Sequence, residues 1–196
     1  MKRRIVLAAG AAGVVLAACG KKEETATGAP SAGAGGTPVS IERIAAEGKG
    51  FNVGSTMAAR VVYVFFDAQC PHCAEMWEAA KPMKSQARFV WMPVGLLGDR
   101  SFSQGAAILN AADPVAAMEQ NEASVRARTG GISAMGVPDA QIQAVKANTK
   151  LFNEFGFTGV PTIVGKNATT GQVVTIDGAI AAPGLAQRLG WSAPSS

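Results

Sequence analysis

A continuous apolar run leads almost directly into a pair of cysteines in the first half of the chain. Residues 61–66 read VVYVFF, and Cys70-Pro71-His72-Cys73 follows after three intervening residues. A run this dense in β-branched and aromatic residues is typical of a strand buried on both faces. Pro71 suits the first turn of a helix, which we expect over 71–83, with Pro82 bending or ending it. A buried strand that meets a helix at a Cys-x-x-Cys motif therefore constrains the fold more than any other feature.

The place of Cys70 at the start of this helix suggests a chemical role for the cysteine pair. Unpaired N–H groups and the positive end of the helix dipole stabilise a thiolate there and lower the thiol pKa. We therefore predict that Cys70 is the exposed nucleophile and that Cys73, one turn later, is the resolving thiol that closes a disulfide. A protonated His72 beside the sulfur favours the thiolate, which makes the disulfide more oxidising.

Two structural roles compete with this redox role. A zinc site needs four ligands, but His72 is the only histidine and lies inside the motif, so only Cys19 remains to complete a set of cysteine and histidine ligands. A purely structural disulfide between Cys70 and Cys73 closes a loop of four residues and restricts the unfolded chain very little. The spacing favours redox chemistry over both, with no metal ion.

The N-terminus has the pattern of an export signal. Lys2, Arg3 and Arg4 precede an apolar run of fourteen residues, Ile5–Ala18, which is shorter than the roughly 20 residues that a membrane-spanning helix needs. Leu16-Ala17-Ala18-Cys19 resembles the lipobox of bacterial lipoproteins, in which the cysteine is acylated and becomes the first residue of the mature chain. We expect a signal peptide at 1–18 and lipidation of Cys19. A conventional signal peptide that happens to end near a cysteine is the alternative.

The segment that follows predicts a tether outside the cytoplasm. Residues 19–40 begin at Cys19 and are rich in Gly, Ala, Thr, Ser and Pro, a composition that gives a reach of roughly 25 Å without a fixed orientation. Loss of the signal peptide lowers the formal charge from +4 to +1, which gives no electrostatic case for nucleic acid. A lipid anchor places the domain in the periplasm, where disulfides persist. Because Gly20 is not the aspartate known for inner-membrane retention in enteric lipoproteins, we expect the outer membrane.

The remaining patterns predict one α/β domain over 41–192. We expect a short helix from Ile41, a second buried strand at 88–97, three helices between about 101 and 155, short strands at 161–164 and 172–177, and a closing helix at 183–189. This order of elements is compatible with a small sheet covered on both faces. The three consecutive helices are interpreted as an inserted helical layer.

A family resemblance rests on several of these segments together. A buried strand, Cys-x-x-Cys at a helix start and the later Gly159-Val160-Pro161-Thr162 resemble the thioredoxin superfamily, in which this proline is cis and faces the active-site sulfurs; from the residues alone, the Val160–Pro161 bond stays open. YVFFDAQCPHCAEMW, AKP at 80–82, AAILNAADPVAAMEQNEAS and FGFTGVPTIV resemble the catalytic domain of the periplasmic DsbC/DsbG disulfide isomerases, nearest to the DsbG branch, over about 41–191. The resemblance implies a thioredoxin-like fold with inserted helices, and substrate binding at Val160, Pro161 and Thr162.

The chain also departs from the isomerase pattern. Pro71-His72 and Val160 are similar to the corresponding residues of the strongly oxidising DsbA enzymes, whereas Asp67 follows the isomerases. We therefore expect Pro71 and Asp67 to tune the redox potential. Val64 occupies the position, six residues before the first cysteine, where DsbA-like and thioredoxin enzymes often bury an acid.

The region before the catalytic domain differs as well. The isomerases are V-shaped dimers with an N-terminal dimerisation domain, and only IERIAAEG stands between the tether and the catalytic domain here. We expect the dimerisation domain to be absent and the protein to be a monomer. Weak isomerase activity follows, because a cleft between two catalytic domains helps to hold unfolded substrate.

The sequence thus predicts a membrane-tethered thiol:disulfide oxidoreductase whose redox equivalents are the thiols of Cys70 and Cys73, with no cofactor. The implied partners are periplasmic proteins with disulfides or free thiols, and either a DsbD-like reductase or a DsbB-like oxidase that resets the dithiol. The competing hypothesis is a non-enzymatic lipoprotein that uses the fold to bind a protein or peptide, with its Cys-x-x-Cys simply oxidised. The sequence leaves open the substrates of the oxidoreductase, its resting redox state, and whether it acts mainly as an oxidant, a reductant or an isomerase.

Overall fold

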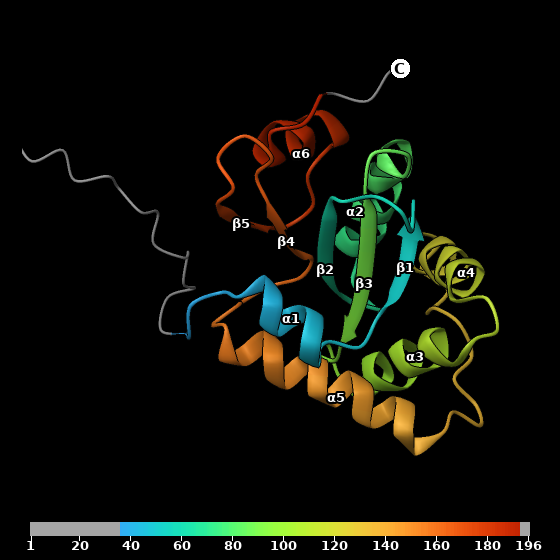
Figure 1. Ribbon diagram of the computed structural model, residues 1–196. Helices are drawn as coiled ribbons and strands as arrows, with labels where there is room; N and C mark the ends of the chain where they lie inside the picture. Colours follow the sequence, from blue (N-terminus) through green and yellow to red (C-terminus); the bar gives the residue numbers. More distant parts are fainter. Residues whose placement is uncertain (1–35, 193–196) are drawn as a thin grey trace, which may run out of the picture.

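A twisted five-stranded sheet lies at the centre of the computed structural model, which describes residues 36–192 (Figure 1). The strands follow the order β1-β3-β2-β4-β5, and β2 pairs with β3 in parallel while the other pairs are antiparallel. Their bounds are Phe51–Gly54 (β1), Val61–Asp67 (β2), Arg88–Val94 (β3), Thr162–Lys166 (β4) and Val173–Asp177 (β5). The helices are Ile41–Glu47 (α1), Pro71–Ala80 (α2), Asp99–Asn110 (α3), Pro114–Arg126 (α4), Asp139–Glu154 (α5) and Ala182–Leu189 (α6), with a 3-10 turn at Lys81–Met83.

The strand predicted from VVYVFF is the middle strand of the sheet. Every residue of β2 after Val61 is buried, because its side chains alternate between two covered faces. Val62, Val64 and Phe66 contribute to the core beneath α2 and α6, together with Trp77 and Leu185. The rings of Trp77 and Trp91 pack edge to face there, with centroids 4.9 Å apart.

The opposite face of the sheet is covered by α1 and α5, which lie side by side in front of the strands in Figure 1. Tyr63 and Phe65 of β2 point to this side, and the Phe65 ring centroid lies 5.8 Å from that of Phe152 on α5. Helices therefore cover both faces of the sheet, and the predicted α/β fold class is confirmed.

The three consecutive helices between β3 and β4 take different places. α5 packs on the sheet through β3, α3 contacts both α5 and α4, and α4 packs against α2. α4 thus brings inserted residues next to the helix that begins at Cys70. Asp113 caps α4 by accepting the N–H groups of Val115 and Ala116, each at 3.0 Å, as its position before Pro114 predicts.

Two elements differ from the predictions. The strand expected over 88–97 ends at Val94, and the short edge strand β1 was not predicted. Residues 37–39, assigned to the tether, lie against α5: the Thr37 N–H donates to the Glu154 carbonyl at 2.9 Å, and Val39 is buried.

The signal peptide, Cys19 and most of the tether lie outside the described residues. Within 36–192, no helix has both the length and the apolar character that crossing a bilayer requires.

Candidate active site

Cys70 lies at the end of the central strand and caps the helix that follows. It is the N-cap of α2 in an extended conformation, and Pro71 occupies the first turn. The Cys70 N–H donates to the Asp67 carbonyl at 3.0 Å, which fixes the turn between β2 and α2. Cys70 thus lies at the start of the helix, as predicted, although its side chain makes no capping hydrogen bond.

The two cysteines have opposite electrostatic environments. Both are free thiols, and Cys73 is fully buried. Cys70 is only 6% exposed, so the prediction that it is exposed is wrong, because the Val160 segment lies against its sulfur. A hydrogen bond from the Cys73 thiol, aided by the N–H groups of Cys73 and His72, lowers the pKa of Cys70 to about 6 against the opposing effects of burial and Asp67. Burial, followed by the interactions with Cys70, raises the pKa of Cys73 well above its ordinary value. At neutral pH the site therefore holds a thiolate at Cys70 and a protonated thiol at Cys73.

His72 faces solvent and has a partner that was not predicted from the sequence. Its side chain is 69% exposed, and its Nδ1 lies 3.0 Å from a carboxylate oxygen of Glu75, one turn further along α2. The hydrogen bond with Glu75 and the charges of Glu75 and Cys70 raise the pKa of His72. His72 therefore stays protonated over a wider pH range, but Glu75 offsets part of its charge.

Asp67 is a buried carboxylate at the end of β2 that ties two segments together. One oxygen accepts the N–H groups of Leu96 and Leu97 at 2.7 and 3.0 Å, and the other accepts the Gln69 N–H at 2.8 Å. These bonds hold the segment after β3 against the segment that leads to Cys70. The negative charge of Asp67 also raises the pKa of Cys70, so it opposes the thiolate.

The predicted substrate-binding segment lies directly against Cys70. The Val160–Pro161 bond is cis, as the family resemblance implied, and the Cys70 Sγ lies 3.5 Å from the Val160 carbonyl oxygen. β4 begins at Thr162, so the backbone of Val160 stands outside the β2–β4 ladder. Buried Thr162 donates its hydroxyl to the Gly159 carbonyl at 2.6 Å and so braces the loop. Apart from Cys19, the structure brings all predicted site residues to this end of the sheet.

A buried polar cluster behind the dithiol was not predicted. Asn121 on α4 donates to the Ala68 carbonyl at 2.8 Å, and its own oxygen accepts the Ile132 N–H at 3.1 Å. Gln104 on α3 donates to the carbonyls of Gly130 and Ile132 at 2.8 and 2.7 Å. Glu122, beside Asn121, is fully buried. The sequence signal was the helical spacing of Met118, Asn121, Glu122 and Val125, which places polar residues on the inner face of α4.

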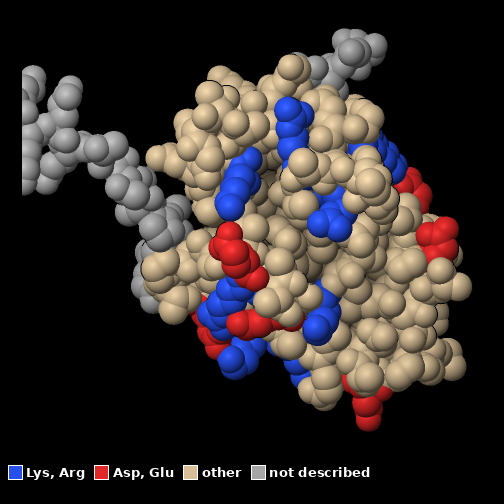
Figure 2. All heavy atoms as spheres, in the orientation of Figure 1, with Lys and Arg blue, Asp and Glu red and all other residues tan. Residues whose placement is uncertain are grey.

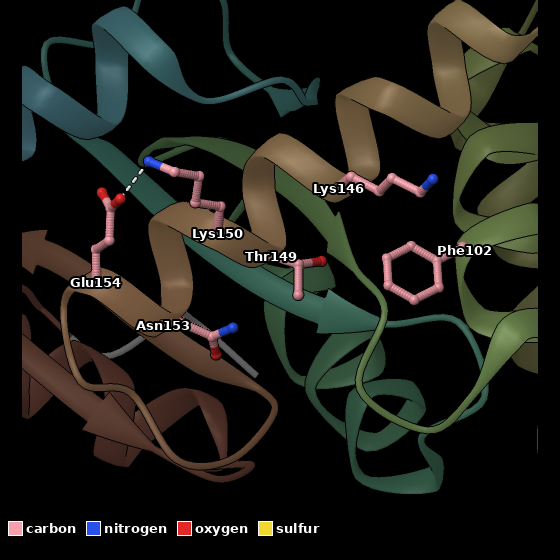
Figure 3. Close-up of a pocket in the computed structure, with 6 residues that line it drawn as sticks. All are labelled: Phe102, Lys146, Thr149, Lys150, Asn153 and Glu154. Carbon is pink, nitrogen blue, oxygen red and sulfur yellow. Dashed lines mark hydrogen bonds and ion pairs between the residues drawn. The ribbon is translucent and has the colours of Figure 1, made fainter.

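Other surface features lie on elements away from the dithiol. Figure 2 shows charges of both signs over α1 and α5, where Arg43 pairs with Glu47 and Glu154. A hollow of about 460 Å³ between α3 and α5 is lined by Phe102, Lys146, Thr149, Lys150, Asn153 and Glu154 (Figure 3). Within the described residues, no group of three or more His, Cys, Asp and Glu side chains is arranged to hold a metal ion.

The chain is similar in sequence to two curated thiol:disulfide interchange proteins. Over 141 residues the chain is 33% identical to the thiol:disulfide interchange protein DsbG of Pseudomonas aeruginosa, covering 70% of this chain and 54% of that protein. Over 116 residues it is 32% identical to DsbG of Escherichia coli, covering 56% of this chain and 45% of that protein. The chain thus spans about half the length of these curated relatives.

The same fold occurs in a solved structure of lower identity. The catalytic domain of ScsC from Proteus mirabilis matches with a TM-score of 0.60 at 18% identity, covering 76% of this chain and 95% of that domain. The family model for a thioredoxin-like domain matches residues 52–190, a range that includes the dithiol, the inserted helices and the cis-proline segment. The chain therefore belongs to the family of thioredoxin-like domains.

Proposed function

We propose that this protein is a periplasmic, membrane-tethered thiol:disulfide oxidoreductase that acts on protein disulfides and thiols through Cys70 and Cys73. The observation that supports it most strongly is the contrast within the pair: Cys70 has a pKa of about 6 at a helix start, and Cys73 is buried with its pKa raised. A thiolate and a protonated thiol side by side are what a two-step exchange needs, because one attacks and the other waits.

The exchange proceeds in two balanced steps. The Cys70 thiolate attacks a substrate disulfide, forms a mixed disulfide and releases one substrate sulfur as a thiolate. Cys73 then loses its proton and attacks the Cys70 sulfur, which closes the Cys70–Cys73 disulfide and releases the second substrate sulfur. The reverse sequence passes the disulfide to a substrate dithiol. The two cysteines carry both electrons, so the reaction needs no metal or organic cofactor.

The surroundings of Cys70 favour an extended peptide as substrate. The Val160 backbone lies outside the sheet ladder and next to the Cys70 sulfur, so it can pair with a substrate strand, with Pro161 and Thr162 fixing its position. A hollow of about 290 Å³ between α2 and the segment before α6 is lined by Glu75, Ala79 and residues 179–181. It offers a mainly apolar place for one substrate side chain close to His72.

A glutathione assay tests the proposed chemistry. Reduced protein is mixed with oxidised glutathione, quenched in acid and weighed by mass spectrometry. Wild type is expected to close its own disulfide, Cys73→Ala to stop as a glutathione mixed disulfide, and Cys70→Ala to react far more slowly because Cys73 is buried and protonated. A wild type that stays reduced, together with a Cys73→Ala variant that forms no adduct, would favour the binding module instead.

The anchor and the cellular partners form a separate part of the proposal. Cys19 is the proposed lipidation site, and labelling cells with a clickable palmitate analogue is expected to mark wild type but not Cys19→Ala. The dithiol is reset either by a DsbD-like reductase or by a DsbB-like oxidase. The redox state of the protein in strains that lack one or the other distinguishes these partners.

A further inference from the structure

Glu122 on α4 is a buried carboxyl group that the two exchange steps above do not use. Its side chain is fully buried, and one oxygen accepts a hydrogen bond of 3.3 Å from the Asn121 amide. Its other oxygen, Oε2, has no hydrogen-bond partner among the described residues. A buried carboxyl oxygen without a partner is costly, so its retention calls for a functional explanation.

The position of Glu122 couples it to the dithiol. α4 packs against α2, and the neighbouring Asn121 holds the carbonyl of Ala68, two residues before Cys70. Charge interactions link Glu122 to both sulfurs: the thiolate of Cys70 acts on the Glu122 carboxyl, and Glu122 acts on the Cys73 thiol. The carboxyl thus lies within electrostatic reach of the reacting groups and is shielded from solvent.

Glu122 stays protonated while Cys70 is a thiolate, mainly because it is buried. Burial is the main cause that raises its pKa, to about 8, and the negative charges of Cys70 and Asp67 add to it. The Asn121 amide and Arg126, further along α4, act in the opposite direction. When Cys70 enters a mixed disulfide its negative charge is lost, so one cause of the raised pKa disappears and Glu122 ionises more readily.

We propose that Glu122 takes the proton of Cys73 in the resolving step and returns it in the reverse step, an inference that rests on the proposed exchange function. In the mixed disulfide, the Glu122 carboxylate accepts the proton of Cys73, the new thiolate forms a bond to the Cys70 sulfur, and the bond from Cys70 to the substrate sulfur breaks. The substrate sulfur leaves as a thiolate. In reverse, a substrate thiolate attacks Cys70, Cys73 leaves with the electron pair, and protonated Glu122 supplies its proton. Glu122 does not touch the substrate; it acts on the Cys73 thiol, as the general base of the resolving step and the general acid of the reverse step.

The first test compares Glu122→Gln with a matched control. Glu119→Gln removes a carboxylate from the same helix that bonds Trp77 and Lys81 instead of facing the dithiol. Rapid-quench mass spectrometry with oxidised glutathione separates formation of the mixed disulfide from its resolution. Glu122→Gln is expected to leave the Cys70 pKa and the first step unchanged and to slow the resolving step about a hundredfold at neutral pH, as is typical of a lost general base. Glu119→Gln is expected to resolve at the wild-type rate.

The pH profile separates a proton-transfer role from a structural one. The wild-type resolving rate is expected to rise with pH and to level off as Glu122 ionises, whereas the rate of Glu122→Gln should keep rising until Cys73 itself ionises. Glu122→Asp, which keeps a titratable group, is expected to restore the plateau. Identical profiles for wild type and Glu122→Gln overturn the proposal. If wild type itself forms no mixed disulfide, the exchange function fails as well, so the two failures are distinguishable.

A second measurement does not depend on the folding of Glu122→Gln. Infrared difference spectra are recorded for Cys73→Ala before and after Cys70 is blocked with glutathione. A protonated-carboxyl band in the reduced form that weakens on blocking supports the proposal. A spectrum with no change in this region overturns it.

Discussion

The hydrogen bond from Cys73 is the largest single cause of the low pKa of Cys70, which makes Cys73→Ala a quantitative test of the site. The bond stabilises the Cys70 thiolate, and hydrogen bonds to charged groups contribute about 1.5–3 kcal/mol. Since one pKa unit corresponds to about 1.4 kcal/mol, its loss is expected to raise the Cys70 pKa from about 6 by about one to two units. The N–H groups of Cys73 and His72 remain, so the pKa stays below that of an ordinary cysteine.

The assay follows the ultraviolet absorbance of the thiolate against pH in Cys73→Ala and in Cys73→Ser. The hydroxyl of Cys73→Ser still donates a hydrogen bond, so its Cys70 pKa is expected to lie between those of wild type and Cys73→Ala. In wild type, only the low-pH transition is compared, because Cys73 ionises well above it. An unchanged Cys70 pKa in Cys73→Ala would refute this reasoning and would mean that the helix start and its backbone N–H groups set the pKa alone.

Four further predictions follow from the same contacts. His72→Tyr is expected to raise the Cys70 pKa and to make the redox potential more reducing. The change in a glutathione titration should be less than about 30 mV, because His72 is exposed and paired with Glu75. A larger change would show that Glu75 does not offset the charge of His72. Asp67→Asn is expected to lower the Cys70 pKa, because a negative charge is lost. It is also expected to lower the free energy of unfolding by about 1–3 kcal/mol, because the amide nitrogen cannot accept a hydrogen bond as the second carboxylate oxygen does. Thiolate titration measures the first effect and urea unfolding the second, and a raised Cys70 pKa would contradict the first. The pKa of Glu122 is raised on folding, so its contribution to stability is present below about pH 4.5 and is lost as pH rises through about 8. Urea unfolding across this range should therefore show Glu122→Gln becoming more stable relative to wild type as pH rises. A difference in unfolding free energy between the two proteins that does not change with pH would contradict the raised pKa. A fragment of residues 36–192 is expected to sediment as a monomer, since the only large hydrophobic side chains exposed within it are Met57, Leu97 and Met135; a stable dimer at micromolar concentration would refute this.

The elements that could be predicted from the sequence are those with strong local signals. The run VVYVFF has no polar interruption, so it could be assigned to a strand buried on both faces. Pro71 indicated the start of the following helix, which ends at Ala80 and continues as a 3-10 turn at Lys81–Met83 within the expected range of 71–83. β1 was missed because it has only four residues and ends at Gly54, which adopts a φ of 97°. The strand over 88–97 was drawn too long because the buried Asp67 carboxylate, remote in sequence, captures the N–H groups of Leu96 and Leu97.

The candidate site likewise contains residues that could be predicted from local sequence signals and residues that could not. The Cys70–Cys73 pair and the Val160–Pro161 segment are recognisable motifs, and the structure places them 3.5 Å apart at the Cys70 sulfur and the Val160 oxygen. Glu75 and Glu122 belong to no recognisable motif. The helical spacing of Glu122 with Met118 and Val125 indicates the inner face of α4, but it does not indicate which element that face packs against. Only the tertiary packing of α4 on α2 buries Glu122 near the dithiol.

The central claim is that Cys70 attacks substrate proteins and that Cys73 resolves the product. The most direct measurement is a non-reducing gel of full-length Cys73→Ala, purified from cells after acid quenching, beside Cys70→Ala and the double variant. The account predicts higher-mass bands in Cys73→Ala alone that collapse to the monomer when dithiothreitol is added. The same bands in Cys70→Ala, or no bands in Cys73→Ala together with no reaction toward oxidised glutathione, would contradict it.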